Sequence, residues 1–119
     1  DSVELVEVAR NLEAIAIPAH PGRAGIGFSE YLSNGKKGFD TVKVVEGLNG
    51  SNRPGEGERA AKLVDQMGYQ TTGGSDAHIV SAIGTCMTEF KSVITNEVDL
   101  VLALQEGDFA PVRLEETTH

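Results

Sequence analysis

Residues 41–78, TVKVVEGLNGSNRPGEGERAAKLVDQMGYQTTGGSDAH, decide the fold, because they hold two strand patterns with a helix pattern between them. The first strand is predicted over Thr41 to Leu48, where β-branched residues are frequent. A helix is predicted from Glu58 onward, with its apolar side chains on one stripe and Gly68 as its stop. A second, short strand is predicted over Tyr69 to Thr72. This order of elements is typical of a βαβ unit with parallel strands.

The sequence on both sides extends this pattern. Apolar positions spaced i, i+3, i+4 and i+7 predict a helix over Val3 to Leu12. The apolar run Ala14 to Ala19 predicts a strand buried on both faces. Near the other end we expect two more strands and, between them, a helix capped by Asn96; the strands cover Cys86 to Phe90 and Ala110 to Leu114. We therefore expect an α/β fold built of βα units around a mostly parallel sheet.

Length and charge restrict the class of protein. The chain has 119 residues and a formal net charge of −8, which suits one modest domain and makes nucleic acid and anionic membrane surfaces unfavourable partners. Its one cysteine, Cys86, cannot form an intrachain disulfide and is expected to be a buried, inert thiol, so a cytoplasmic location is the default. The chain starts at Asp1 without methionine, which suggests a piece of a longer protein as readily as a processed whole one.

Two of the three histidines follow predicted strands and are candidates for metal binding. His20 follows the apolar run that ends at Ala19, and His78 lies two residues after Asp76. In an extended chain the Asp76 and His78 side chains project to the same side and can bind one cation. Carboxylate and imidazole ligands suit zinc, manganese or iron, whereas solvated residues at the sheet edge are the structural alternative.

Three segments resemble a known family. IPAHPGR (17–23), VEGLNG (45–50) and GGSDAH (73–78), with IGT (83–85) after them, occur in the order found in the C-terminal half of the PHP (polymerase and histidinol phosphatase) superfamily. The resemblance implies that residues 1–119 are a single C-terminal PHP-like segment, part of a distorted seven-stranded βα barrel. The rim of such a barrel holds two or three metal ions that hydrolyse phosphoesters.

The resemblance also implies roles for individual residues. His20, Asp76 and His78 match metal ligands of the family, and Asp76 and His78 are the expected catalytic residues. The family's remaining ligands would belong to a missing N-terminal part before Asp1, so the metal site of this chain would be incomplete. A metal-activated water would attack the phosphoester in line.

Two further residues are candidates for substrate binding. Arg23 has the chemistry to bind a substrate phosphate through its forked guanidinium, although a surface arginine without a specific contact is about as plausible. Asn49 matches the family's Glu-x-x-Asn strand end together with Glu46. The alternative for Asn49 is turn formation, because Asn49-Gly50 is a favoured turn pair.

We therefore expect part of a metal-dependent phosphoesterase that acts on a small phosphomonoester or a nucleotide phosphodiester and is inactive as this fragment alone. Its expected partners are the phosphorylated substrate and the missing N-terminal part. The alternative is a non-catalytic PHP-associated module that acts in interactions or in self-association through exposed strand edges.

Overall fold

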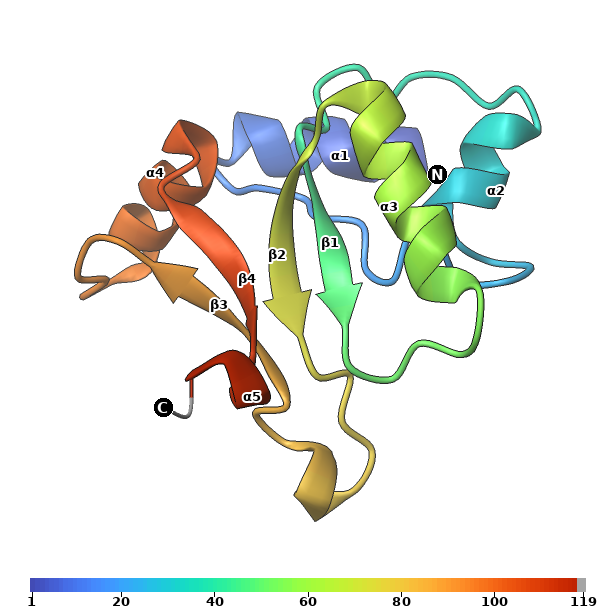
Figure 1. Cartoon of the computed structure of the whole chain (residues 1–119). Coiled ribbons are helices and arrows are strands. Elements are labelled where there is room, and N and C mark those ends of the chain that lie inside the picture. The colour runs from blue at the N-terminus through green and yellow to red at the C-terminus, as the bar shows by residue number, and fades with distance from the viewer. Residues whose placement is uncertain (118–119) are drawn as a thin grey trace.

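The computed structural model describes residues 1–117, which form a mixed α/β domain with a parallel strand pair and helices (Figure 1). The elements are α1 (Ser2–Asn11), α2 (Phe28–Ser33), β1 (Val44–Asn49), α3 (Glu56–Met67), β2 (Gln70–Gly74), a 3₁₀ turn (Val80–Ala82), β3 (Cys86–Phe90), α4 (Glu97–Glu106), β4 (Phe109–Arg113) and α5 (Leu114–Thr117).

The βαβ unit predicted from the sequence is confirmed as β1-α3-β2. β1 and β2 pair in parallel, with Val44 opposite Gln70. α3 ends at Gly68, which adopts a left-handed φ of 70° that glycine accepts at low cost. α3 buries Leu63 against Val45 and Tyr69, and α2 lies on the same side of the molecule (Figure 1). This apolar core fixes the two parallel strands relative to their crossover helix.

The second half of the molecule corrects the expectation of a mostly parallel sheet. β3 and β4 pair antiparallel, with Phe90 opposite Phe109. The chain turns back after α4 at Gly107, whose φ is 78°, and the Lys91 amide then bonds the Asp108 carbonyl at 3.1 Å. β4 therefore returns antiparallel along β3, and the strands among residues 1–117 form two two-stranded sheets without closing a barrel.

The two sheets are joined at Gly73. The Thr88 hydroxyl accepts a hydrogen bond from the Gly73 amide at 3.0 Å and donates one to the Gly73 carbonyl at 2.8 Å. A Cβ at position 73 would overlap the Met87 carbonyl oxygen, so only glycine lets β2 approach β3 this closely. Hydrogen bonds of the Thr88 side chain thus link the two sheets in place of a regular backbone ladder.

The predicted strand over Ala14 to Ala19 is wrong. The segment is irregular, and its link to β1 is one hydrogen bond, from the Glu46 amide to the Pro18 carbonyl at 3.0 Å. Pro18 has no N–H to donate, so it cannot supply a second backbone hydrogen bond of a ladder at this position. The apolar pattern still reflects packing, because Ile15 and Ile17 are half-buried against the core.

None of the helices of residues 1–117 is long and apolar enough to cross a membrane.

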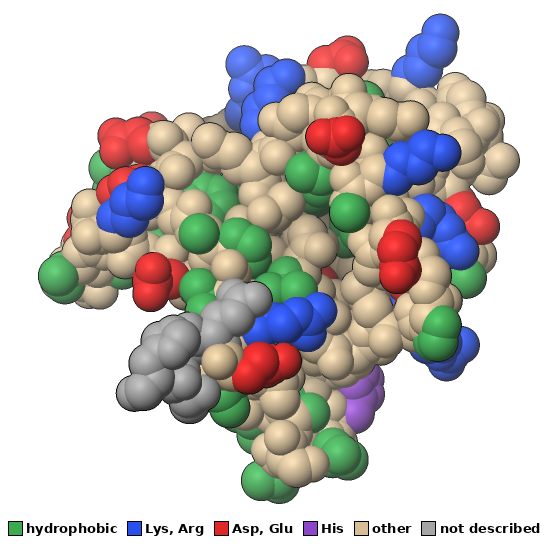
Figure 2. All heavy atoms as spheres, viewed as in Figure 1, with side chains coloured by type: hydrophobic (Ala, Val, Ile, Leu, Met, Phe, Trp, Pro, Cys, Tyr) green, Lys and Arg blue, Asp and Glu red, His purple; other side chains and the backbone are tan. Residues whose placement is uncertain are grey.

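The surface carries an exposed apolar patch. Figure 2 shows apolar side chains at the lower tip of the molecule, where the 3₁₀ turn lies in Figure 1; Ile79, Val80 and Ile83 are all more than two-thirds exposed there.

Candidate functional site

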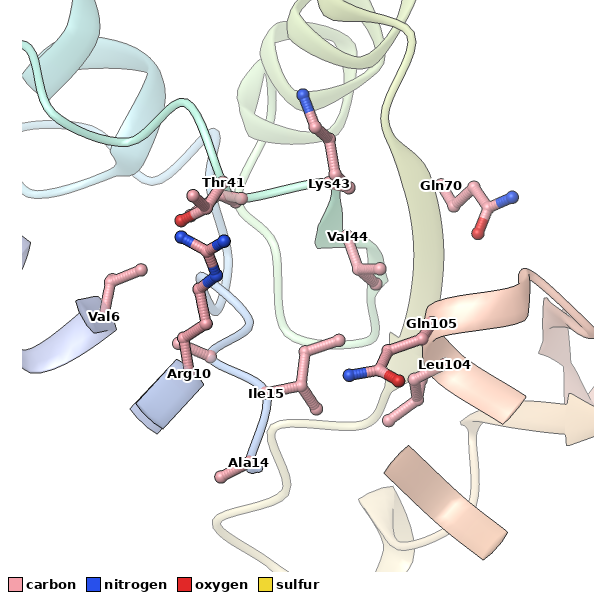
Figure 3. Close-up of a pocket in the computed structure, with 12 residues that line it drawn as sticks. Val6, Arg10, Ala14, Ile15, Thr41, Lys43, Val44, Gln70, Leu104 and Gln105 are labelled. Carbon is pink, nitrogen blue, oxygen red and sulfur yellow. The ribbon is translucent and has the colours of Figure 1, made fainter. Parts of the chain in front are cut away.

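The candidate site lies at the carboxyl ends of β1 and β2, the lower edge in Figure 1. β1 ends at Asn49 and β2 ends at Gly74, and the chain continues from there into the loop that carries Asp76. Loops at this edge of parallel strands commonly hold ligand sites. The opposite edge has a hollow of about 230 Å³ near Lys43 and Gln70 (Figure 3), which shares no residue with the site.

Asp76 is the centre of the site. Its Oδ2 atom accepts hydrogen bonds from Arg23 Nη2 at 3.0 Å and from Asn49 Nδ2 at 3.3 Å. The Arg23 bond, and then the Asn49 bond, hold the pKa of the Asp76 carboxyl below its usual value. The backbone of Asp76 has a φ of 52°, a conformation that aspartate adopts more readily than most residues. Asp76 is therefore a fixed, ionised carboxylate at neutral pH.

Asn49 fits both interpretations of its sequence position. Its side-chain oxygen accepts a hydrogen bond from the Ser51 amide at 2.8 Å, which forms the expected turn. Its amide nitrogen bridges two carboxylates, because it also donates to Glu46 Oε2 at 2.9 Å. Asn49 is 2% exposed. The residue positions the acids of the site, and its predicted role in substrate binding stays a prediction.

His20 is anchored to the same network. Its backbone amide donates to Glu46 Oε2 at 2.6 Å, and its φ of 31° is unusual for a residue other than glycine. Its ring atom Nδ1 is buried and has no hydrogen-bond partner. A buried imidazole nitrogen without a partner is costly, unless a ligand takes the position that a hydrogen bond would fill.

His78 lies next to Asp76 but faces solvent. Its side chain is 82% exposed, and its Nδ1 atom is 4.0 Å from Asp76 Oδ1 and 2.8 Å from the Asp76 carbonyl oxygen. The short contact favours the tautomer with the proton on Nδ1, which leaves the lone pair on Nε2. His78 therefore presents Nε2 as a ligand or proton acceptor.

Glu56 is a site residue that sequence reasoning missed. It is 2% exposed and lies at the start of α3. An acidic residue at a helix N-terminus is usually explained by its favourable interaction with the helix dipole alone. Its carboxylate accepts from the Ala24 amide at 2.9 Å and the Arg53 amide at 2.8 Å, which lower its pKa, and it lies 3.3 Å from Arg23 Nε. Glu56 thus fixes the loop that carries Arg23, and no local sequence signal reveals this contact.

The side chains of the site have part of the chemistry of a metal centre. The unpartnered His20 ring nitrogen, the Asp76 carboxylate and the His78 imidazole have the donor chemistry that zinc, manganese or iron require. Their arrangement does not fit: within residues 1–117, no group of three or more His, Cys, Asp or Glu side chains is placed to hold a metal ion. The positive charge beside Asp76 is instead the Arg23 guanidinium.

Comparison with known families agrees with the motifs. Residues 54–109 match the profile of a family described as PHP-associated (PHP_C). The match supports the resemblance of this chain to the C-terminal portion of a PHP-superfamily protein. Asp76, His78 and Glu56 lie inside the matched range, whereas His20 and Arg23 precede it. No curated protein and no solved structure matches the chain.

Proposed function

We propose that this chain is the C-terminal part of a PHP metal-dependent phosphoesterase that acts on a small phosphomonoester or a nucleotide phosphodiester. In this proposal His20, Asp76 and His78 contribute ligands to zinc, manganese or iron. The observation that carries the proposal is the buried, unpartnered His20 Nδ1 at the strand edge where Asp76 is held ionised beside His78. The family match supports it.

The proposal requires further ligands from another part of the parent protein, because the described residues do not form a complete metal site. Within residues 1–117, β1 pairs with β2 on one side only, and its other side has a single backbone hydrogen bond, from Glu46 to Pro18. An incompletely paired strand can accept another strand. We propose that further strands add there and complete the distorted seven-stranded barrel that the resemblance implies.

The proposal is tested on the parent protein that includes this chain and the sequence before it. Hydrolysis of p-nitrophenyl phosphate and bis-p-nitrophenyl phosphate is measured with Zn²⁺, Mn²⁺ and Fe²⁺. We expect Asp76→Asn to lower kcat/KM at least 100-fold. Asp65→Asn is the matched control, because Asp65 lies exposed on α3 and makes the same change of charge. Absence of turnover with every metal, or an Asp76→Asn variant as active as the control, would contradict the proposal.

A second candidate is a non-catalytic PHP-associated module. It is favoured by the Arg23–Asp76 ion pair, which balances the Asp76 charge without a metal ion. The exposed apolar side chains of Ile79, Val80 and Ile83 would then serve self-association. Sedimentation velocity across a concentration series tests this role: we expect a dimer that Val80→Ser weakens, and a monomer at all concentrations would exclude self-association.

A further inference from the structure

The hollow at the amino ends of β1 and β2 is a candidate site separate from the Asp76 edge (Figure 3). Its volume is about 230 Å³, and its walls come from α1, the segment that follows α1, the start of β1 and the end of α4. Concave places that are mostly apolar and contain a few polar groups are where small ligands usually bind. The lining of this hollow therefore indicates which ligand would fit.

The floor of the hollow is apolar and belongs to a packed core. Val44 is 3% exposed and Leu104 is 6% exposed, and both belong to one buried cluster with Phe109. Ile15 packs against this cluster and lines the hollow as well. Val44 is fixed further by the pairing of β1 with β2, where it lies opposite Gln70. The floor is therefore preformed, so an aliphatic group can bind there without the cost of ordering it.

The charged groups of the hollow are basic. Arg10 and Lys43 line it, and among residues 1–117 no Asp or Glu does so, although the chain has 18 acidic and 10 basic residues. Arg10 has one long contact, 3.9 Å from its Nη1 atom to Glu7 Oε2, and the two side chains are 66% and 46% exposed. Exposed pairs of this kind contribute little to stability. The Arg10 guanidinium is therefore available to an anion.

The guanidinium and a hydroxyl lie at the same rim. In Figure 3 the Arg10 side chain points toward Thr41, and both residues line the hollow. The Thr41 hydroxyl has no hydrogen-bond partner among residues 1–117, so it can donate to a bound anion. The planar fork of a guanidinium matches a carboxylate, which it binds with two parallel hydrogen bonds. A carboxylate at this rim leaves the rest of its molecule above the apolar floor.

We propose that this hollow binds a small aliphatic carboxylate. Arg10 and Thr41 bind the carboxylate group at the rim, and Lys43 adds positive charge. The aliphatic body of the ligand lies on the floor formed by Val44 and Leu104. The structural alternative is that Arg10 serves only the last turn of α1, where a basic residue interacts favourably with the helix dipole. The inference requires no metal ion and does not rest on the proposed function.

The probe is hexanoate, and its binding to the 119-residue chain is followed by ¹H–¹⁵N NMR titration. We expect saturable binding with a dissociation constant on the order of 1 mM, because the ligand is small. Acetate, which lacks the aliphatic body, and hexan-1-ol, which lacks the charge, should each bind about fivefold more weakly or worse. Absence of saturable hexanoate binding, or equal binding of hexan-1-ol, would overturn the inference.

Arg10→Gln tests the residue that binds the carboxylate group. We expect it to weaken hexanoate binding about tenfold, because it removes the charged, forked contact. Arg53→Gln is the matched control, since Arg53 is exposed, does not line the hollow and makes the same change of charge. If the two variants bind hexanoate equally well, Arg10 serves only its helix, and the inference fails.

A second substitution keeps the inference testable if Arg10→Gln unfolds. Gln105 is exposed on α4 and lines the hollow, so Gln105→Glu places a negative charge there without disturbing the core. The new charge should weaken hexanoate binding about fivefold by repulsion and leave hexan-1-ol binding unchanged. Gln66→Glu makes the same change on the exposed side of α3 and should bind hexanoate like the wild type. Wild-type hexanoate affinity in Gln105→Glu would contradict binding in this hollow.

Discussion

The two halves of the molecule are stabilised in different ways. At the carboxyl edge of β1 and β2, polar groups from distant segments satisfy one another, as in the bond from Arg23 to Asp76. In the β3–α4–β4 half, the contacts that hold the start of α4 are local: the Asn96 side chain caps α4 by accepting from the Asp99 amide at 2.8 Å, and the Thr95 hydroxyl donates to Asp99. Other side-chain contacts there span more residues, as in the bond from Ser92 to Asp108. The comparison shows that α4 is capped by its own sequence neighbours, whereas the site depends on contacts between segments far apart in the chain.

The largest effect is expected where the two halves meet. Gly73→Ala should lower the free energy of unfolding by about 3 kcal/mol, because the new Cβ would overlap the Met87 carbonyl oxygen and push β2 away from β3. Gly57→Ala is the control, since its Cβ would lie in α3 with its nearest neighbour at 3.8 Å. Urea denaturation measures both variants, and equal stabilities would show that the halves are not tightly joined.

The carboxyl edge should make stability depend on pH. The pKa of Asp76 is held below its usual 3.8 and that of Glu56 below its usual 4.5, so both carboxylates bind protons more weakly in the folded state than in the unfolded state. Their stabilisation is complete above about pH 5 and is lost as the pH falls through the folded-state values.

Urea denaturation from pH 7 to pH 3 measures this dependence. The variant Asp76→Asn with Glu56→Gln should lose less stability over this range than the wild type does. A matched double variant, Glu58→Gln with Asp65→Asn, changes exposed acids of α3 and should keep the wild-type slope. Parallel pH profiles for all three proteins would show that the site acids do not stabilise the fold.

The smallest effect is expected in the local half. Asn96→Ala removes the side-chain cap of α4 and should cost about 1 kcal/mol, which thermal denaturation resolves. Asn34→Ala is a suitable comparison, because Asn34 is exposed at the end of α2 and no side-chain bond is seen there. If both variants are as stable as the wild type, the Asn96 cap does not stabilise the β3–α4–β4 half.

The same contrast explains how much the sequence predicted. The Asn96 cap and the Gly68 helix stop were predicted, because each acts within one turn of its helix. The strand over Ala14 to Ala19 was predicted wrongly. An apolar run indicates that a segment is buried, but it does not indicate whether its backbone forms the hydrogen bonds of a sheet.

For the site, motifs placed Asp76 and His78 after the end of a strand, and the structure has them there, whereas the segment before His20 is irregular. The bridging roles of Glu56 and Asn49 could not be predicted, because they depend on how the Gly22 loop lies against α3. The pairing of Arg23 with Asp76 spans 53 residues and has no local signature. The sequence therefore revealed the donor types but not which contacts they make.

The most direct test is an anomalous-difference map from crystals, grown with Zn²⁺, of the parent protein that includes this chain. We expect a zinc peak at Asp76 with His20 or His78 beside it. Zinc bound only elsewhere, with the Arg23–Asp76 ion pair intact, would contradict the assignment of this edge as a metal-ligand site.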